Sequence, residues 1–218
     1  MVFVENHHIV AQEGKKIFRI PLSQVPLTRQ GQIGFQTENV MASVAAAWAV
    51  NVPWDTIGEG LATFISDVQG VPGRFNLFDY RGATVIADYG HNPDAIQALV
   101  NAVENMPASK RSVVISGAGD RRDQDIRDQT QILGQAFDDV LLYEDACQRG
   151  REDGEVLSLL REGLHGAERT THIQEIRGEF KAIDTAMDRL QPGELCLILI
   201  DQVEEALAYI GQKVKAAA

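Results

Sequence analysis

Two short polar segments carry most of the residues that could take part in chemistry. The first is residues 88–94 (DYGHNPD), where an acid and an imidazole stand three positions apart. Asp88 could accept hydrogen bonds from the hydroxyls of a ribose, and His91 could donate one to a ribose or phosphate oxygen. Asn92 and Pro93 are explained by helix initiation alone, as N-cap and first helical residue. The alternative for the whole segment is an ordinary loop between a strand and a helix.

The second segment is residues 117–123 (GAGDRRD). Glycines such as Gly119 let the backbone approach a ligand closely when they follow a strand. Asp120, Arg121 and Asp123 could pair with the two charges of a zwitterionic amino acid, the arginine holding a carboxylate in bidentate geometry. The spacing is not the G-x-G-x-x-G dinucleotide fingerprint, so no dehydrogenase is predicted. The alternative is a surface salt-bridge cluster that caps the next helix.

Arg74 is a third candidate, in the segment Pro72-Gly73-Arg74-Phe75. A cation at a junction between domains is well placed to meet phosphates, whereas a solvated linker arginine is the ordinary alternative. The sequence has no G-x-x-x-x-G-K-[ST] or shorter G-K-[ST], no Cys/His spacing typical of zinc sites and no G-x-S-x-G. It therefore predicts no P-loop, no metal ligands and no serine nucleophile, and we assign no catalytic residue.

The elements that position these segments alternate regularly from residue 74 onward. Strand-like runs occur at 84–88, 112–116, 140–144, 171–176 and 195–200, and helical stretches at about 93–106, 123–137, 153–164, 178–190 and 202–215. Short apolar strands, each followed by a helix, predict a doubly wound α/β domain with a mostly parallel sheet of about five or six strands. Ligands of such sheets bind at the carboxyl ends of the strands, where both polar segments begin.

The first part of the chain has a different order of predicted strands and helices. Strand-like runs at 2–4, 9–11 and 17–20, with a turn at 12–15, precede helices predicted at about 38–50 and 53–67, and residues 69–73 are predicted to be a linker. We therefore expect a small α+β portion over residues 1–70 and the α/β domain over residues 71–218.

The composition narrows the classes of partner. The 218 residues carry a formal net charge of −11, which argues against nucleic acid or an anionic membrane as the main partner. No signal peptide and no apolar run of about 20 residues is present, so no membrane span is predicted. Cys147 and Cys196 are far apart, and we expect both to be reduced thiols in a cytoplasmic protein.

The order of the motifs resembles the Mur ligase superfamily. The segments that carry this resemblance are 34–39 (GFQTEN), 72–75 (PGRF), 88–94 and 117–123. Three later segments are similar to the C-terminal part of the cyanophycin synthetases: 142–145 (LYED), 149–155 (RGREDGE) and 191–194 (QPGE). The resemblance covers nearly all of the chain.

The resemblance implies two parts of a larger enzyme. Residues 1–70 would be the tail of a central ATPase domain, and residues 71–218 a C-terminal Rossmann-like domain. In this family pattern Asn39 would lie near the adenine of ATP and Arg74 on its phosphates. Asp88 would bind the ribose, with His91 close to the nucleotide. Gly119, Asp120, Arg121 and Asp123 would help to form the pocket of the incoming amino acid.

The activity implied by the resemblance is ATP-dependent amide-bond formation. An amino acid, expected to be arginine, would be joined to a carboxylate of an aspartate polymer through an acyl phosphate. ATP and Mg²⁺ are expected only together with a P-loop segment, which this sequence lacks, so we expect a truncated ligase that is inactive alone. Milder departures are Gln36 and Gly90, where many Mur ligases carry Asn and Ala.

The expected partners are nucleotide and amino-acid small molecules, and either a synthetase chain that bears a P-loop or a second copy of this chain. A different class of function stays open at this point. The chain could be a non-catalytic module that binds a nucleotide or an amino acid and docks on a full-length synthetase as a regulator.

Overall fold

The computed structural model describes residues 1–144 and 147–217, so Asp145 of the LYED segment lies outside the described residues. The chain forms two compact units. The first contains Met1–Ser66 and Asn101–Met106, and the second contains Asp67–Val100 and the residues from Pro107 onward. The predicted division at residue 70 stays a prediction, and each unit is described by itself.

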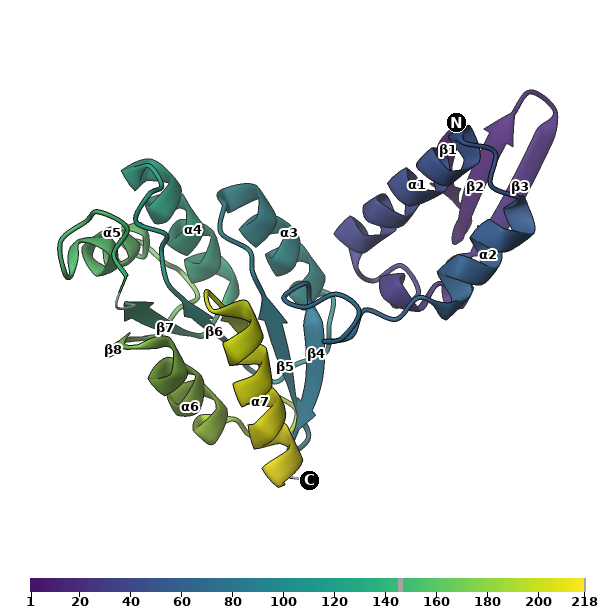
Figure 1. Ribbon diagram of the computed structural model, residues 1–218. Helices are drawn as coiled ribbons and strands as arrows, with labels where there is room; N and C mark the ends of the chain where they lie inside the picture. The colour runs from purple at the N-terminus through teal and green to yellow at the C-terminus, as the bar shows by residue number, and fades with distance from the viewer. Residues whose placement is uncertain (145–146, 218) are drawn as a thin grey trace. The chain divides into compact units, whose positions relative to one another are not determined.

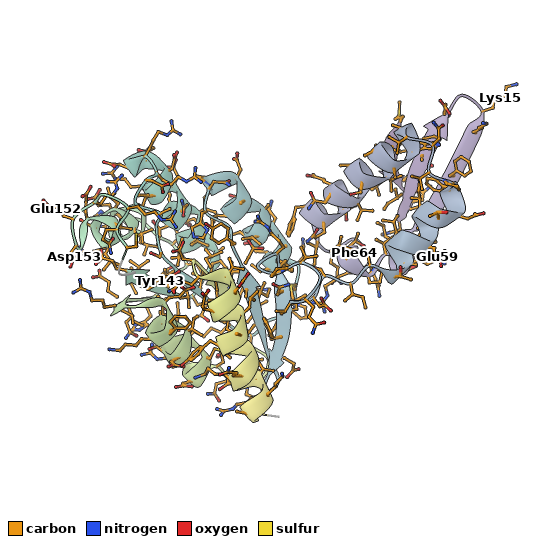
Figure 2. All side chains as sticks on the ribbon, viewed as in Figure 1. Lys15, Glu59, Phe64, Tyr143, Glu152 and Asp153 are labelled. Atoms are coloured by element: carbon orange, nitrogen blue, oxygen red, sulfur yellow. The ribbon has the colours of Figure 1, made fainter. Side chains whose placement is uncertain are left out.

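The first unit begins with an antiparallel sheet in the order β1-β2-β3 (Figure 1). Its elements are β1 (Val2–Glu5), β2 (His8–Glu13), β3 (Lys16–Pro21), the 3-10 turns η1 (Leu22–Gln24) and η2 (Pro26–Thr28), α1 (Gly34–Ala49) and α2 (Trp54–Thr63). Figure 2 shows Lys15 at the tip of the β2–β3 hairpin. The core forms where alternate strand residues such as Ile9 and Ile20 cluster with Val40, Val44 and Ile57.

Two helix boundaries in this unit differ from the sequence-based prediction. Helix α1 begins at Gly34 rather than near residue 38, because its first turn buries Gln36 and Thr37. Packing, not a capping side chain, therefore sets this start. Helix α2 ends at Thr63, four residues early, because Phe64 is already extended and the apolar side chains that follow find no core.

The second unit is built on a six-stranded sheet in the order β4-β5-β9-β6-β7-β8. Its strands are β4 (Asn76–Tyr80), β5 (Ala83–Asp88), β6 (Arg111–Ile115), β7 (Asp139–Glu144), β8 (His172–Arg177) and β9 (Leu195–Leu199). Its helices are α3 (Pro93–Glu104), α4 (Asp123–Ala136), α5 (Glu155–Gly163), α6 (Glu179–Arg189) and α7 (Val203–Ala217). All strands are parallel except β4, which confirms the predicted fold class.

Helices cover both faces of this sheet. Figure 1 shows α3, α4 and α5 on one side and α6 and α7 on the other. Every residue of β9 is buried, as expected for a central strand of a sheet covered twice. Tyr143 lies inside this unit (Figure 2) and donates a hydrogen bond from its hydroxyl to the carbonyl of Leu199 at 3.1 Å. Among the described residues, no helix is long and apolar enough to cross a lipid bilayer.

Strand β4 was not predicted from the sequence. It pairs with β5 through a two-residue turn, Arg81-Gly82, in which both residues have positive φ, 54° and 78°. Such a turn joins twisted antiparallel strands directly. The hairpin places β4 at the edge of the sheet, beside the strand that ends in Asp88.

The position of β9 determines where the loops meet. It is the last strand in the chain, yet it lies between β5 and β6. The chain leaves β5 and β6 towards α3 and α4 on one face, and leaves β9 towards α7 on the other. Connections that diverge in this way open a crevice at the carboxyl ends of the strands. The two polar segments 88–94 and 117–123 border that crevice.

Candidate active site at the carboxyl edge of the sheet

Asp88 ends β5 and is almost completely buried, with 7% of its surface exposed. Its Oδ2 accepts a hydrogen bond from the backbone N–H of Phe75 at 2.7 Å. Burial raises the pKa of this carboxyl to about 6, while the N–H of Phe75 and the charge of Arg74 act in the opposite direction. One oxygen of Asp88 therefore fixes the segment that carries Arg74.

That segment is a tight loop with several internal contacts. The backbone N–H of Gly73 donates to Oδ1 of Asn76 at 2.7 Å, and Nδ2 of Asn76 donates to the carbonyl of Val71 at 3.0 Å. The carbonyl of Gly73 accepts from the N–H of Tyr89 at 2.9 Å. Gly73 has a φ of 68°, which favours glycine. Arg74 is exposed at the head of the loop, with its guanidinium carbon 6.0 Å from the centre of the Tyr89 ring.

His91 lies beneath the surface of the crevice, with 9% of its surface exposed. Its ring packs on Tyr89 with centroids 4.3 Å apart, and its Nε2 lies 3.7 Å from Oδ1 of Asp201. Its Nδ1 has no hydrogen-bond partner among the residues that the structure describes. Burial lowers the pKa of the imidazole, with Asp201 acting in the opposite direction, so His91 is neutral near pH 7.

Asp201 follows β9, and its carboxylate faces His91 from the loop after β5 and Arg149 from the loop after β7. Its Oδ1 accepts a hydrogen bond from Nη2 of Arg149 at 2.9 Å, on the same oxygen that faces His91. Nη1 of Arg149 lies 3.6 Å from Oδ1 of Asp120. Arg149 therefore connects the loop after β7 to the loops after β6 and β9.

Arg151 holds the glycine-containing loop in place. Its Nε donates to the carbonyl of Gly119 at 2.7 Å, and its Nη2 donates to the carbonyl of Arg121 at 2.7 Å and to Asp123 at 2.8 Å. A Cβ atom at residue 119 would overlap the carbonyl oxygen of Gln148, so only glycine fits this close approach. The loop of residues 117–123 is thus shaped by the segment that follows β7.

A small cavity opens at this edge. It is lined by His91, Ser116, Gly117, Ala118, Cys147, Gln148, Arg149 and Asp201. The lining offers hydrogen-bond donors and acceptors of both charges, as a polar metabolite requires. In residues 1–144 and 147–217, no group of three or more His, Cys, Asp or Glu side chains could hold a metal ion.

The structure brings most of the predicted site residues to one edge. Arg74, Asp88 and His91 follow or face the end of β5, and Gly119, Asp120, Arg121 and Asp123 form the loop after β6. Asn39 belongs to the first unit, where it is exposed on α1 and donates from Nδ2 to Oε1 of Gln36 at 3.2 Å. Asn92 is the predicted N-cap of α3, because its Oδ1 accepts from the N–H of Ala95 at 2.9 Å.

Sequence reasoning did not assign Arg149, Arg151 or Asp201 to the site. The first two belong to the RGREDGE segment, which served only as a mark of family resemblance. A signal was present, since two arginines in the loop after the strand at 140–144 fall under the same carboxyl-edge rule as the other loops.

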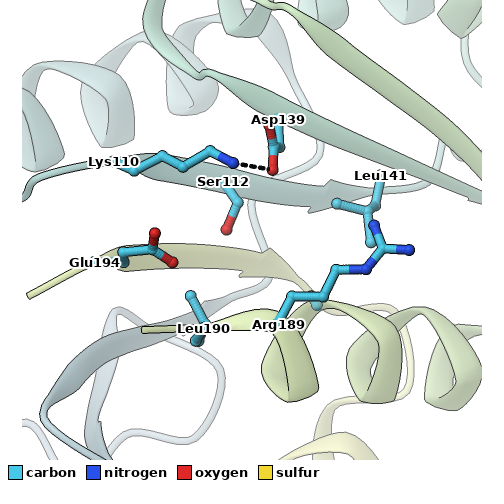
Figure 3. A pocket seen from close by; sticks show the side chains of 8 residues that line it. Lys110, Ser112, Asp139, Leu141, Arg189, Leu190 and Glu194 are labelled. Carbon is cyan, nitrogen blue, oxygen red and sulfur yellow. Dashed lines mark hydrogen bonds and ion pairs between the residues drawn. The ribbon is translucent and has the colours of Figure 1, made fainter. Parts of the chain in front are cut away.

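A second cavity lies at the opposite edge of the same sheet (Figure 3). Its lining consists of Lys110, Ser112, Asp139, Leu141, Ala186, Arg189, Leu190 and Glu194. Nζ of Lys110 donates to Oδ2 of Asp139 at 2.6 Å, so these two charges already satisfy each other. Since ligands of such sheets bind at the carboxyl edge, this cavity at the amino edge is not part of the candidate site.

A model of a known protein family matches most of the second unit. Residues 73–199 match the family model of the Mur ligase, glutamate ligase domain. The chain belongs to this family. Its matched residues include β5 to β9 and the loops that carry Arg74, Asp88, His91 and Arg149.

Individual relatives agree with this membership. The chain is 32% identical to the cyanophycin synthetase of Trichormus variabilis over 207 residues, which are 94% of this chain and 23% of that protein. It is 30% identical to the UDP-N-acetylmuramoyl-L-alanyl-D-glutamate--2,6-diaminopimelate ligase of Alkaliphilus metalliredigens over 83% of this chain and 35% of that protein. The chain thus spans about a quarter of the length of the cyanophycin synthetases that it matches.

Solved structures show the same fold. E. coli FolC in complex with DHPP and ADP superposes with a TM-score of 0.68 at 21% identity, covering 99% of this chain and 45% of FolC. MurC of Thermotoga maritima superposes with a TM-score of 0.63 at 16% identity, covering 99% of this chain and 45% of MurC. At these identities the likeness concerns the arrangement of strands and helices.

Proposed function

We propose that this chain is part of an ATP-dependent ligase that joins an amino acid, arginine, to a side-chain carboxylate of an aspartate polymer. The observation that carries the proposal is the convergence of His91, Asp201 and Arg149 at the carboxyl edge, between the Arg74 loop and the glycine loop. The similarity to cyanophycin synthetases over 94% of the chain supports the choice of reaction.

The nucleotide belongs to the β5 side of this site in the proposal. Arg74 offers an exposed cation to the phosphates of ATP. Asp88 offers its carboxylate to a ribose hydroxyl, and its Oδ2 also accepts the hydrogen bond from the N–H of Phe75. His91 is neutral and offers one nitrogen as donor and the other as acceptor. Asn39 is proposed for the adenine on the basis of the family pattern alone.

The amino acid belongs to the loop after β6 in the proposal. The side chain of Arg121 is exposed, and its guanidinium is proposed to bind the α-carboxylate of the incoming amino acid. Asp120 is 59% exposed in its side chain and carries the opposite charge. Asp123, although paired with Arg151, adds a second carboxylate towards which a cationic side chain is attracted.

The proposed reaction has two steps. A carboxylate oxygen of the polymer attacks the γ-phosphorus of ATP, forming an acyl phosphate and releasing ADP. The uncharged amine of the amino acid then attacks the acyl carbon, phosphate leaves, and the nitrogen loses a proton to give the amide. Arg74 and Arg121 would offset negative charge on the phosphates and the substrate carboxylate. Mg²⁺ bound together with ATP would neutralise further charge on the phosphates.

The amino-acid site is tested by calorimetric titration of the chain with L-arginine and, separately, with Mg-ATP. Replacing Arg121 with Gln should weaken arginine binding by roughly 10-fold or more, since a charge-assisted hydrogen bond contributes about 1.5–3 kcal/mol. Arg122→Gln is the matched control, because the guanidinium of Arg122 already donates two hydrogen bonds to the carboxylate of Asp125, at 2.7 and 3.0 Å. Equal affinity in both variants would remove Arg121 from the site.

A non-catalytic docking module is the second candidate, and a surface property favours it. The first unit exposes large apolar side chains at Met1, Val4, Ile17, Val50 and Ile65. Exposed apolar groups of this kind are typical of surfaces that bind another protein when they are contiguous. Release of ADP after addition of ATP, an aspartate polymer and arginine would exclude this candidate, whereas ligand binding without turnover would leave it in place.

A further inference from the structure

A buried carboxylate lies behind the candidate site without belonging to it. Glu179 is the first residue of α6 and has 1% of its surface exposed. The residue before it, Gly178, has a φ of 95° and donates its N–H to the carbonyl of Glu144 at 2.9 Å. The end of β7 therefore fixes the backbone from which the Glu179 side chain extends.

Glu179 uses both of its oxygens on the segment that follows β9. Oε1 accepts from the backbone N–H of Asp201 at 2.9 Å, and Oε2 accepts from the N–H of Gln202 at 3.1 Å and from its Nε2 at 3.2 Å. These N–H groups precede α7, which begins at Val203, and have no partner within that helix. The carboxylate thus satisfies the start of α7 and favours its positive end, although it belongs to a different helix.

The residue held in this way is the one on which the site converges. Oδ1 of Asp201 accepts from Arg149 at 2.9 Å and lies 3.7 Å from Nε2 of His91. The carbonyl of Asp88 accepts from the N–H of Ile200 at 2.9 Å, so β5 holds the residue before Asp201. Displacing the backbone at Asp201 would change the placement of its carboxylate against both partners.

We propose that Glu179 is a positioning residue of this site, holding Asp201 so that its carboxylate aligns Arg149 with His91. The inference rests on the proposed function only for the ligand that the site receives. Glu179 does not touch the cavity, since it is absent from the cavity lining. Its role is exerted through the backbone of Asp201.

A helix cap without any positioning role would give a different experimental result. Loss of a cap lowers stability but leaves the environment of His91 unchanged. Loss of a positioning carboxylate also removes the nearby negative charge of Asp201 from the imidazole. Burial has the largest effect on the pKa of His91 and lowers it. The charge of Asp201 raises this pKa, whereas the charges of Arg149 and Arg121 lower it. A displaced Asp201 should therefore lower the pKa of His91 further.

The experiment compares Glu179→Ala and Glu179→Gln in the full chain. The pKa of His91 is followed by the pH titration of imidazole resonances in NMR spectra, assigned with His91→Gln. Arginine affinity is measured in parallel. Glu179→Ala should lower the pKa of His91 and weaken arginine binding several-fold. Glu179→Gln keeps one acceptor and should lie between Glu179→Ala and the parent chain.

Asp184→Asn is the matched control. Asp184 also links α6 to α7, through Tyr209 at 2.8 Å and Lys213 at 2.6 Å, but it has no contact with Asp201. Its variant should lose stability and keep the titration of His91. An unchanged His91 titration in a folded Glu179→Ala chain would overturn the proposal. If the parent chain binds no arginine, the proposed function fails, while the His91 titration still decides the role of Glu179.

Discussion

Replacing Gly119 with Ala tests how closely the arginine-containing loop after β7 approaches the loop after β6. A Cβ atom there would lie 3.1 Å from the carbonyl carbon of Gln148 and nearer still to its oxygen. Non-bonded carbon atoms ordinarily stay about 3.5–4.0 Å apart, so backbone has to move. Both neighbours are constrained, since Arg151 holds the carbonyl of Gly119 and Arg149 is bonded to Asp201.

The expected cost is about 1–3 kcal/mol, the range for inserting a carbon atom into a packed site. For a domain of this size that lowers the melting temperature by roughly 2–12 °C. Gly211→Ala is the control, because a Cβ there meets no atom within 4 Å and the residue lies inside α7. It should raise stability by about 0.5–1 kcal/mol.

The assay can be directed at the correct unit of the chain. Both tryptophans, Trp48 and Trp54, lie in the first unit, whereas the four tyrosines lie in the second. Thermal unfolding followed by tyrosine absorbance should therefore shift in Gly119→Ala. An unshifted tyrosine transition, together with unchanged arginine affinity, would refute the close approach of residues 119 and 148.

Three further predictions concern the β5 side of the site. Asn92→Ala removes the cap of α3 and should cost about 1 kcal/mol, measured as a lower midpoint of urea unfolding; an unmoved midpoint would show that the cap contributes nothing. Asp88 has its pKa raised from 3.8 to about 6, so its contribution to stability is complete below pH 3.8 and is lost as the pH rises through 6. The free energy of unfolding of the parent chain minus that of Asp88→Asn should therefore fall by about 2–3 kcal/mol between pH 4 and 7, and a flat difference would contradict the raised pKa. Arg74→Ala should weaken Mg-ATP binding several-fold in calorimetry, and equal affinity would place Arg74 outside the nucleotide site.

Periodicity was sufficient to predict most of the regular elements. The strands that end in Asp88 and Glu144 are short and largely apolar, and each precedes a helix with an acidic first turn, so their type and order followed from local pattern. Strand β4 was not predicted, because only two of its five residues are buried, Asn76 and Tyr80. Its turn, Arg81-Gly82, also lacks the Asn or Asp that usually marks such a hairpin.

The site was predictable only where its residues follow strands in obvious clusters. His91 and Arg121 stand in such clusters. Asp201 does not, because it comes 52 residues after Arg149 and 110 after His91. The three meet only because β9 enters the sheet between β5 and β6. Strand order arises from packing over long sequence separations, which the spacing of residues in one chain does not encode.

The place of β9 also affects how the protein is made. On the ribosome, β5 and β6 emerge about 80 residues or more before the strand that separates them, so each lacks one of its two final neighbours during most of synthesis. The edges that β9 will occupy stay open to other strands until residue 199 has left the exit tunnel. Folding of the second unit is thus completed from its C-terminal end, and slow translation or early termination there would leave an aggregation-prone nascent chain.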